Sequence, residues 1–371
     1  MHYKRYIPVA WVLLLTTFVL TFAAAPASAA QRVVTRSAQN QATTSLTANI
    51  YLTTGTLAPI FQSRINQQVP GAVSSAISNI VSKLPPTDQG WAGQMATTLI
   101  QPSATLSSLA PQQNGLAARI RVSLYPGDPQ PINASMLVGF TVRGGSSVQV
   151  SAQPMNGSPA LVSGPLTTLS IPIGHLNSIR TTPSCGSAAL AVNLQVPMSL
   201  GQHQASANTS AGLAIPQQPQ DQRAAQIGTS SYVEIPASSL ASLGDSIGTL
   251  QVSSDMTARN IAVAVQGGEL VITSDIYFGF LQIASATTYV QPVVSNGNLG
   301  VNVLKTDLTF LQLFTFPNNS YNQQIQQTLN TELNGALAGK FYATSAAIGS
   351  NSQVPCAASD SLILTGNTSL I

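Results

Sequence analysis

Residues able to perform acid, base, nucleophilic or metal chemistry are sparse in this chain of 371 residues. The sequence has 11 Asp and Glu residues, 3 His and 2 Cys. Asp128, Asp245 and Glu269 each follow a glycine, which is typical of a turn. His175 and His203 have no second ligand at the spacing of a helix or finger site, so they predict no metal centre. We therefore predict no catalytic residues, although a carboxylate pair assembled only by folding stays open.

The two cysteines, Cys185 and Cys356, are candidates for a disulfide. In an oxidising compartment two cysteines most simply form one bridge. The closed loop is long, so the chain-entropy estimate of its stabilisation is about 4–5 kcal/mol. Two free, buried thiols are the alternative.

The N-terminus resembles a secretion signal. Lys4 and Arg5 precede the apolar run Trp11–Leu20, and Ala27-Ser28-Ala29 has the small-x-small pattern of a cleavage site. Residues 1–29 are therefore predicted to be a signal peptide, and the protein is predicted to be extracytoplasmic. An uncleaved segment that tethers the chain to the membrane is the alternative.

The charge of the chain argues against nucleic acid as a partner. Without Lys4 and Arg5, 12 of the 14 basic residues remain, against 11 acidic ones. A balance of +1 spread over the chain leaves no basic surface for a phosphate backbone. The polar surface must instead consist mainly of uncharged side chains.

The N-terminal half is predicted to hold a helix and antiparallel strands. Residues 30–52 are polar without clear periodicity, so they predict a flexible arm. Residues 53–200 predict a helix-plus-sheet module, with the helix running from about Leu57 to Leu84 and divided or kinked at Pro70. One helix face would hold Ile77, Ile80, Val81 and Leu84.

Period-two alternation is clear within residues 115–200. Arg119 and Arg121 alternate with apolar residues and so point away from the core. The two interpretations are that these arginines face solvent or that they contact lipid head groups. The apolar positions of the same strand are Leu116, Ala118, Ile120 and Val122. Residues 201–229 predict a linker or long loop, and residues 230–371 a second module. Two related modules, or one continuous module with an inserted sheet, both fit this order.

The strongest pattern lies in residues 261–371. Two strand pairs turn at Gly267-Gly268 and at Asn296-Gly297, and a helix over 320–339 and a final apolar strand follow. An ordinary closed core is one interpretation, and an apolar surface left open for an acyl chain is the other, since each buried CH₂ contributes about 0.8 kcal/mol. The candidate lipid-groove residues, chosen by alternation and helical spacing, are Ile261, Val263, Val265, Leu270, Ile272, Ile276, Phe278, Phe280, Val301, Val303, Ile325, Leu329 and Leu333.

Residues 230–371 also resemble a known family. Gly267–Thr273, Gln291–Leu299, the helix 320–339 and Ser361–Thr368 are similar, in this order, to segments of the LmeA-like phospholipid-binding proteins of the tubular lipid-binding (TULIP) superfamily. The resemblance implies an α+β fold in which a strongly twisted antiparallel sheet wraps around long amphipathic helices. It further implies an apolar lipid groove, no catalysis and a role in the cell envelope.

The sequence thus favours an exported, non-enzymatic protein that binds phospholipid or another acyl lipid and contacts a membrane surface transiently, without a cofactor. A structural or adhesive envelope protein with a closed, β-rich core is the alternative. A secreted hydrolase is the third hypothesis, and it requires polar groups that converge in a cleft. If Cys185 and Cys356 are bridged, they tie the two halves of the chain together.

Overall fold

The computed structural model describes most of the chain after residue 43. Thr43–Ile371 form one compact unit. The described residues are 44–155, 157–159, 163–171, 174–198, 231–252, 255–319, 322–323, 325–327, 329–330 and 341–368. The predicted signal peptide (1–29) and linker (201–229) lie outside them, as does His203. The helices of the described part include none of the length and hydropathy needed to span a bilayer.

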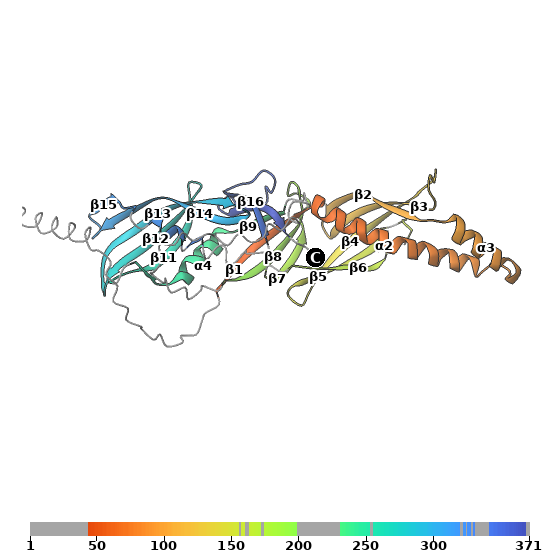
Figure 1. Ribbon diagram of the computed structural model, residues 1–371, viewed down its shortest axis with the longest axis horizontal. Helices are drawn as coiled ribbons and strands as arrows, with labels where there is room; N and C mark the ends of the chain where they lie inside the picture. Colours follow the sequence, from red (N-terminus) through yellow and green to blue (C-terminus); the bar gives the residue numbers. More distant parts are fainter. Residues whose placement is uncertain are drawn as a thin grey trace, which may run out of the picture. The chain divides into compact units, whose positions relative to one another are not determined.

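Strands from both halves of the chain pair in one six-stranded sheet, here called the joining sheet (Figure 1). β1 lies at its centre and pairs antiparallel with β8 from the N-terminal half and with β9 from the C-terminal half. The two halves are therefore continuous through main-chain hydrogen bonds. In spatial order the strands are β16 (Phe341–Ile348), β17 (Leu362–Thr368), β9 (Ser231–Ile235), β1 (Thr44–Thr53), β8 (Ala188–Met198) and β7 (His175–Thr181).

The expectation of a flexible arm over 30–52 is wrong for residues 44–52, because these residues form β1. Leu46, Ala48, Ile50 and Leu52 alternate along the strand and are buried. Thr47 and Asn49 between them are polar and half-buried, so residues 46–50 do alternate with period two, although residues 30–52 as a whole are mostly polar. Threonine favours strands and asparagine does not, so the pairing of β1 with β8 and β9 and the burial of its apolar face decide the strand. Residues 30–43 lie outside the described part of the chain.

A second sheet packs against the long helix α2 (Thr54–Val81) (Figure 1). Thr53 caps the helix, since its side-chain oxygen accepts a hydrogen bond from the Thr56 amide at 3.1 Å. The apolar residues Phe61, Ile65, Val69 and Val73, at a spacing of four, are buried. The strands are β2 (Ser103–Gln112), β3 (Gly115–Ser123), β4 (Ile132–Arg143), β5 (Ser147–Pro154) and β6 (Gly164–Ser170).

The helix departs from its predicted form in two respects. It is not divided at Pro70, because burial of Val69 and Val73 on either side offsets the hydrogen bond that proline removes, and the kink stays a prediction. The expected apolar face further along is wrong at Ile80, which is 63% exposed. A second helix, α3 (Pro86–Leu99), begins directly at the proline pair, in keeping with the preference for proline in a first helical turn.

The third sheet contains the strand pairs predicted for residues 261–310 (Figure 1). Its turns lie where expected, with positive φ at Gly267, Gly268, Asn296 and Gly297. A short helix, α4 (Ala237–Ile247), packs on β11. The strands are β10 (Leu250–Gln251), β11 (Met256–Gln266), β12 (Glu269–Phe278), β13 (Leu281–Ser295), β14 (Asn298–Phe310) and β15 (Phe314–Pro317).

The predicted disulfide is confirmed: Cys185 and Cys356 are bridged, with their Cα atoms 5.2 Å apart. Beside it, the Ser187 amide donates to the Gln353 carbonyl at 3.1 Å. The segment between β16 and β17 is thus fastened to the turn before β8. The described fold belongs to the α+β class and consists mainly of antiparallel sheet, and both features were predicted from the sequence.

Candidate functional site

The candidate lipid-groove residues that lie on β11, β12 and β14 share one face of the β10–β15 sheet. Cross-strand pairs join Val263 to Ile272, and Leu270 to Val290. Ile261, Val263, Leu270, Val301 and Val303 are buried, and Val265 and Ile272 are half-buried. With Val290 and Leu299, several of them belong to the main core, and we call Val263, Leu270, Val290, Leu299 and Val301 the inner cluster.

Phe278 and Phe280 differ from the other candidates. β12 ends at Phe278, and Gly279 takes a positive φ of 60°. Phe280 therefore lies in the turn rather than on the strand, and the prediction that it shares the strand's apolar face is wrong. Its side chain is 95% exposed. The apolar alternation continues to Phe280, one residue past Gly279, whereas the strand ends at Phe278.

A helical segment closes the free edge of β14 with polar side chains. The Asn330 Oδ1 accepts from the Val301 amide at 2.6 Å, and the Gln326 Oε1 from the Val303 amide at 3.3 Å. Asn322 continues this stripe at the same spacing of four. On the adjacent stripe of the same segment, Ile325 and Leu329 pack against the main core, whereas Leu333 lies outside the described residues.

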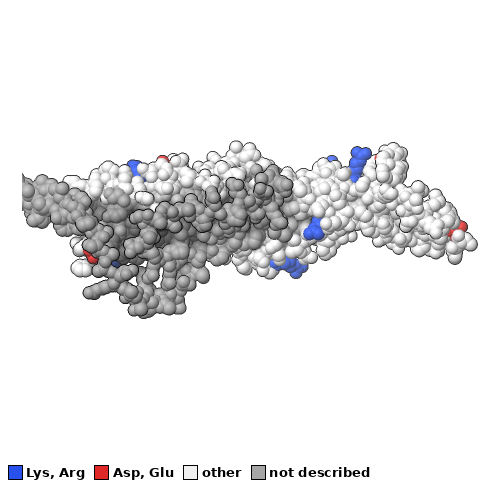
Figure 2. All heavy atoms as spheres, in the orientation of Figure 1, with Lys and Arg blue, Asp and Glu red and all other residues white. Residues whose placement is uncertain are grey.

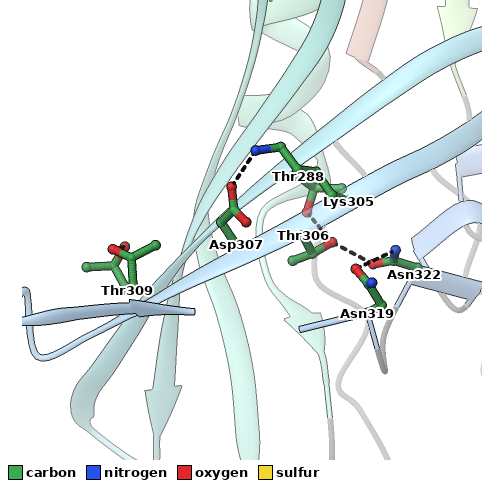
Figure 3. A network of polar contacts seen from close by, with 8 residues as sticks. Thr288, Lys305, Thr306, Asp307, Thr309, Asn319 and Asn322 are labelled. Atoms are coloured by element: carbon green, nitrogen blue, oxygen red, sulfur yellow. Dashed lines mark hydrogen bonds and ion pairs between the residues drawn. The ribbon is translucent and has the colours of Figure 1, made fainter. Parts of the chain in front are cut away.

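A polar pair interrupts the apolar face beyond the inner cluster (Figure 3). The Thr288 and Thr306 hydroxyls are 3.2 Å apart, and both residues are buried. Thr306 donates to the Asn322 Oδ1 at 2.7 Å, so its oxygen accepts from Thr288. The face therefore consists of two apolar parts with hydrogen-bonded hydroxyls between them.

The second apolar part, here called the outer cluster, consists of Ala258, Ile276, Ala284 and Ala286. These side chains remain 6% to 9% exposed, whereas Leu116 and Val150 beneath α2 are fully buried. Three of the four are alanines, so the backbone lies close to the surface of the cluster. Half-buried apolar side chains border it: Leu250, Val252, Met256, Ile283, Leu308 and Phe310.

The outer cluster continues into two exposed hairpin tips. The β12–β13 and β14–β15 turns are neighbours, because the Leu311 amide donates to the Ile283 carbonyl at 3.1 Å. We call the exposed apolar side chains at these turns the tip residues: Phe278, Phe280, Leu281, Leu311, Leu313, Phe314 and Phe316. Alternation alone did not single out the outer-cluster alanines or the second tip, although the run Phe310–Phe316 is apolar at five of its seven positions.

The buried carboxylate of Glu234 is the strongest candidate for acid–base chemistry among the described residues, and its environment is structural. It accepts from the Tyr51 hydroxyl at 2.7 Å, from the Asn49 amide at 2.9 Å and from the Ala358 main-chain amide at 2.7 Å. Burial, and then the bond to this carboxylate, raise the pKa of Tyr51. The Glu234 Oε2 is thus engaged by β1, and the Oε1 by the segment that follows Cys356.

Other titratable groups are scattered over the described surface (Figure 2). The Asp128 carboxylate accepts from the Leu124 and Gln130 amides, both at 2.9 Å, which confirms its turn role. Lys305 pairs with Asp307 at 2.9 Å, and this hydrogen bond raises the pKa of the Lys305 ammonium (Figure 3). Across the described ranges, no three His, Cys, Asp or Glu side chains converge as a metal site would require.

One sequence pattern matches a hydrolase motif without its structural context. Gly244-Asp245-Ser246-Ile247-Gly248 has the Gly-x-Ser-x-Gly spacing. In α/β-hydrolases that serine lies on a sharp turn from a strand into a helix. Ser246 instead falls in the last turn of α4, which ends at Ile247. The backbone thus does not present this serine as a nucleophile elbow does.

The described fold and surface define an α+β protein with an apolar, uncharged candidate site. The chain matches no protein-family model and no curated protein. Among solved structures it is similar to P47 of Clostridium botulinum E1, at 5% identity and a TM-score of 0.31, over 87% of this chain and 99% of that one. It is also similar to a lipopolysaccharide binding protein, at 9% identity and a TM-score of 0.31, over 88% and 99%. Similarity at this level carries no argument about function.

Proposed function

We propose that this chain is an exported, non-enzymatic lipid-binding protein of the cell envelope, which holds acyl chains of phospholipid against the outer cluster. The observation that carries the proposal is the alanine-rich outer cluster of Ala258, Ile276, Ala284 and Ala286, which leads through a half-buried apolar border to the exposed hairpin tips. A surface of this composition offers no hydrogen bond or charge. Its natural ligand is therefore a hydrocarbon chain.

Energy considerations support an acyl chain. About ten CH₂ groups that leave water contribute roughly 8 kcal/mol before the cost of ordering the chain. The alanines provide width for the chain, since a larger side chain at Ala284 or Ala286 would occupy the same volume. The Thr288–Thr306 pair forms a polar boundary at one end of the surface.

Export and fold class support the same proposal. The N-terminal signal pattern and the Cys185–Cys356 disulfide both fit an oxidising, extracytoplasmic location. We further propose that the sheets curl around helices, as in the tubular lipid-binding proteins. Gln62 and Gln68 on α2 support this, because their amides bond to carbonyls of Ala104 on β2 and Leu166 on β6, the two edge strands of one sheet.

Native mass spectrometry of the gently purified protein tests the proposal. We expect a bound lipid whose mass identifies a phospholipid or related acyl lipid. Ala286→Phe should reduce the lipid-bound fraction, because the ring fills the outer cluster. Ala264→Phe, on the opposite face of the same sheet, is the matched control and should leave the bound fraction unchanged. Absence of lipid, together with no uptake of a fluorescent phospholipid, would contradict the proposal.

A structural envelope protein is the second candidate. The fully buried residues between α2 and its sheet, such as Ile65 on the helix and Val150 on β5, favour it because that layer is closed. A protein with this role would retain no lipid, and Ala286→Phe and Ala264→Phe would behave alike. The same pair of variants therefore separates the two functions.

A further inference from the structure

We infer that the two adjacent hairpin tips insert into the hydrocarbon of a lipid bilayer. This inference deepens the proposed function and rests on it, because it identifies the source from which the outer cluster takes its lipid. It concerns a different set of atoms, namely the tip residues, and so can fail separately.

The tips combine exposure with apolar character to a degree unusual for a surface in water. Phe280 is 95% exposed and Leu313 is 72% exposed, at the centres of the two turns. The segments 276–284 and 308–317 contain no Asp, Glu, Lys or Arg. Contiguous exposed apolar patches mark surfaces that are covered in function.

The form of the patch favours a bilayer over a folded partner. The side chains project from two hairpin turns rather than from a flat sheet face. A main-chain hydrogen bond between Leu311 and Ile283 holds the turns together, and the Thr309 and Thr315 hydroxyls, 2.9 Å apart, link the strands of the second hairpin. Hairpins with satisfied main-chain groups can enter an apolar medium at low cost, because few unpaired amides are desolvated.

The side chains next to the tips are of the types found at the interface between a membrane and water. Arg259 lies over the Tyr277 ring, 4.7 Å from its centroid, and donates to the Gly279 carbonyl at 3.3 Å. The Asp275 carboxylate is bonded to Asn260 and Gln282, at 2.8 and 2.9 Å. Tyrosine and arginine next to apolar tips fit the level of lipid head groups.

The charge near the tips predicts which membranes are bound. Arg259 and Lys305 are balanced by Asp255, Asp275 and Asp307, so this end has no net positive charge. Anionic lipid is then not required, and binding should change little with salt. The tips also adjoin the outer cluster, since Phe278 pairs with Met256, and Phe310 with Ala284. A lipid chain leaving the bilayer would thus meet apolar side chains throughout.

Hydrogen–deuterium exchange of the complete chain, with and without phosphatidylcholine vesicles, tests the inference locally. We expect exchange in 277–284 and 309–316 to slow by about tenfold on binding, because water is excluded there. The readout is specific to these peptides and is therefore independent of membrane contact by the N-terminal apolar run. The protection should be equal at low and high salt.

Matched variants complete the test. Phe280→Ser with Leu313→Ser should abolish the protection while leaving thermal unfolding unchanged, since both side chains are exposed. Ile80→Ser with Trp91→Ser removes comparably exposed apolar groups from α2 and α3 and should preserve it.

Three results would overturn the inference. One is vesicle-dependent protection over 86–99 instead of the tips. Another is tip protection that rises with protein concentration without vesicles, which would indicate a second copy as the partner. The third is unprotected tips in a protein that co-purifies with lipid, in which case the proposed function stands and the insertion fails. Protected tips without any co-purified lipid would support insertion and contradict the lipid-holding function instead.

Discussion

Two sheets of this protein carry apolar faces, and they are covered to different extents. The β2–β6 sheet lies beneath α2, whose 28 residues span about 42 Å. On the β10–β15 sheet, α4 has 11 residues and spans about 16 Å, whereas the 15 residues of β13 extend over about 50 Å. Among the described residues, α2 is therefore longer than either helical segment that packs on the β10–β15 sheet, namely α4 and 322–330.

The two regions also share a device at their sheet edges. In the closed region the Gln62 side chain accepts from the Leu106 amide at 2.6 Å and donates to the Ala104 carbonyl at 2.8 Å. In the open region Asn330 and Gln326 accept from amides of β14. Helical amide side chains therefore satisfy edge main-chain groups in both places. The difference between the regions lies in apolar cover and not in edge protection.

The largest expected effect comes from the disulfide, because its loop encloses the open sheet and leaves the closed one outside. The sequence separation of Cys185 and Cys356 is 171 residues. Replacing both with serine should lower the free energy of unfolding by about 5 kcal/mol in the chain-entropy model. Urea unfolding measures this loss.

Hydrogen exchange of the same double variant sharpens the comparison. The exchange rates of amides in β10–β15 should increase more than those of amides in β2–β6, because only the β10–β15 sheet lies within the released loop. Equal acceleration in both sheets would show that the joining sheet transmits the loss, and would contradict separate stabilities for the two regions.

Elements with strong local patterns could be predicted from the sequence. Apolar and polar residues alternate clearly along β3, where the apolar positions are buried and Arg119 and Arg121 are exposed. The Gly and Asn turns of the third sheet require positive φ and so mark hairpins directly. β2 was missed because it is a mostly exposed edge strand without clear alternation.

The joining sheet could not be predicted, because periodicity does not identify a strand's partner. β1 pairs with β8 and β9, well over a hundred residues away along the chain. For the site, alternation located Ile276 correctly on the apolar face. It gave no sign of the exposure left by neighbouring alanines, since exposure depends on what covers the face. The expected helix over 320–339 is helical at each position that the structure describes from Asn322 to Asn330.

A matched pair of truncations compares the two faces next. Ile65 on α2 is fully buried in the closed region, and Ile276 is 9% exposed in the outer cluster. Ile65→Ala should cost about 3–4 kcal/mol, since the tightly packed cavity cannot collapse. Ile276→Ala should cost about 2 kcal/mol, because three carbons lose burial at about 0.8 kcal/mol each while a site at the edge of the core adds little cavity cost. Chemical denaturation of both variants gives the comparison, and equal losses would mean that the outer cluster is as closed as the core.

The edge amides give a smaller effect. Gln62→Ala and Asn330→Ala each leave main-chain groups of an edge strand without their partner, which should cost about 1–2 kcal/mol. Similar losses in the two variants are expected, because the device is the same in both regions. Gln67→Ala, on the exposed side of α2, is the control and should be nearly neutral. A loss confined to Gln62→Ala would show that the helical segment 322–330 does not protect β14 in solution.

The smallest effect on stability, and the most specific one on function, is expected from Thr288→Val. Valine has nearly the shape of threonine, and Thr306 keeps its bond to Asn322, so the change should cost about 0.5 kcal/mol or less. It removes one side of the polar boundary between the inner and outer clusters and lengthens the continuous apolar face. If acyl chains lie on that face, the bound lipids should shift toward longer chains, which native mass spectrometry resolves directly. Thr287→Val alters the opposite face of β13 and should leave the lipid masses unchanged. An unchanged lipid profile in both variants would place the bound chains away from the Thr288–Thr306 pair.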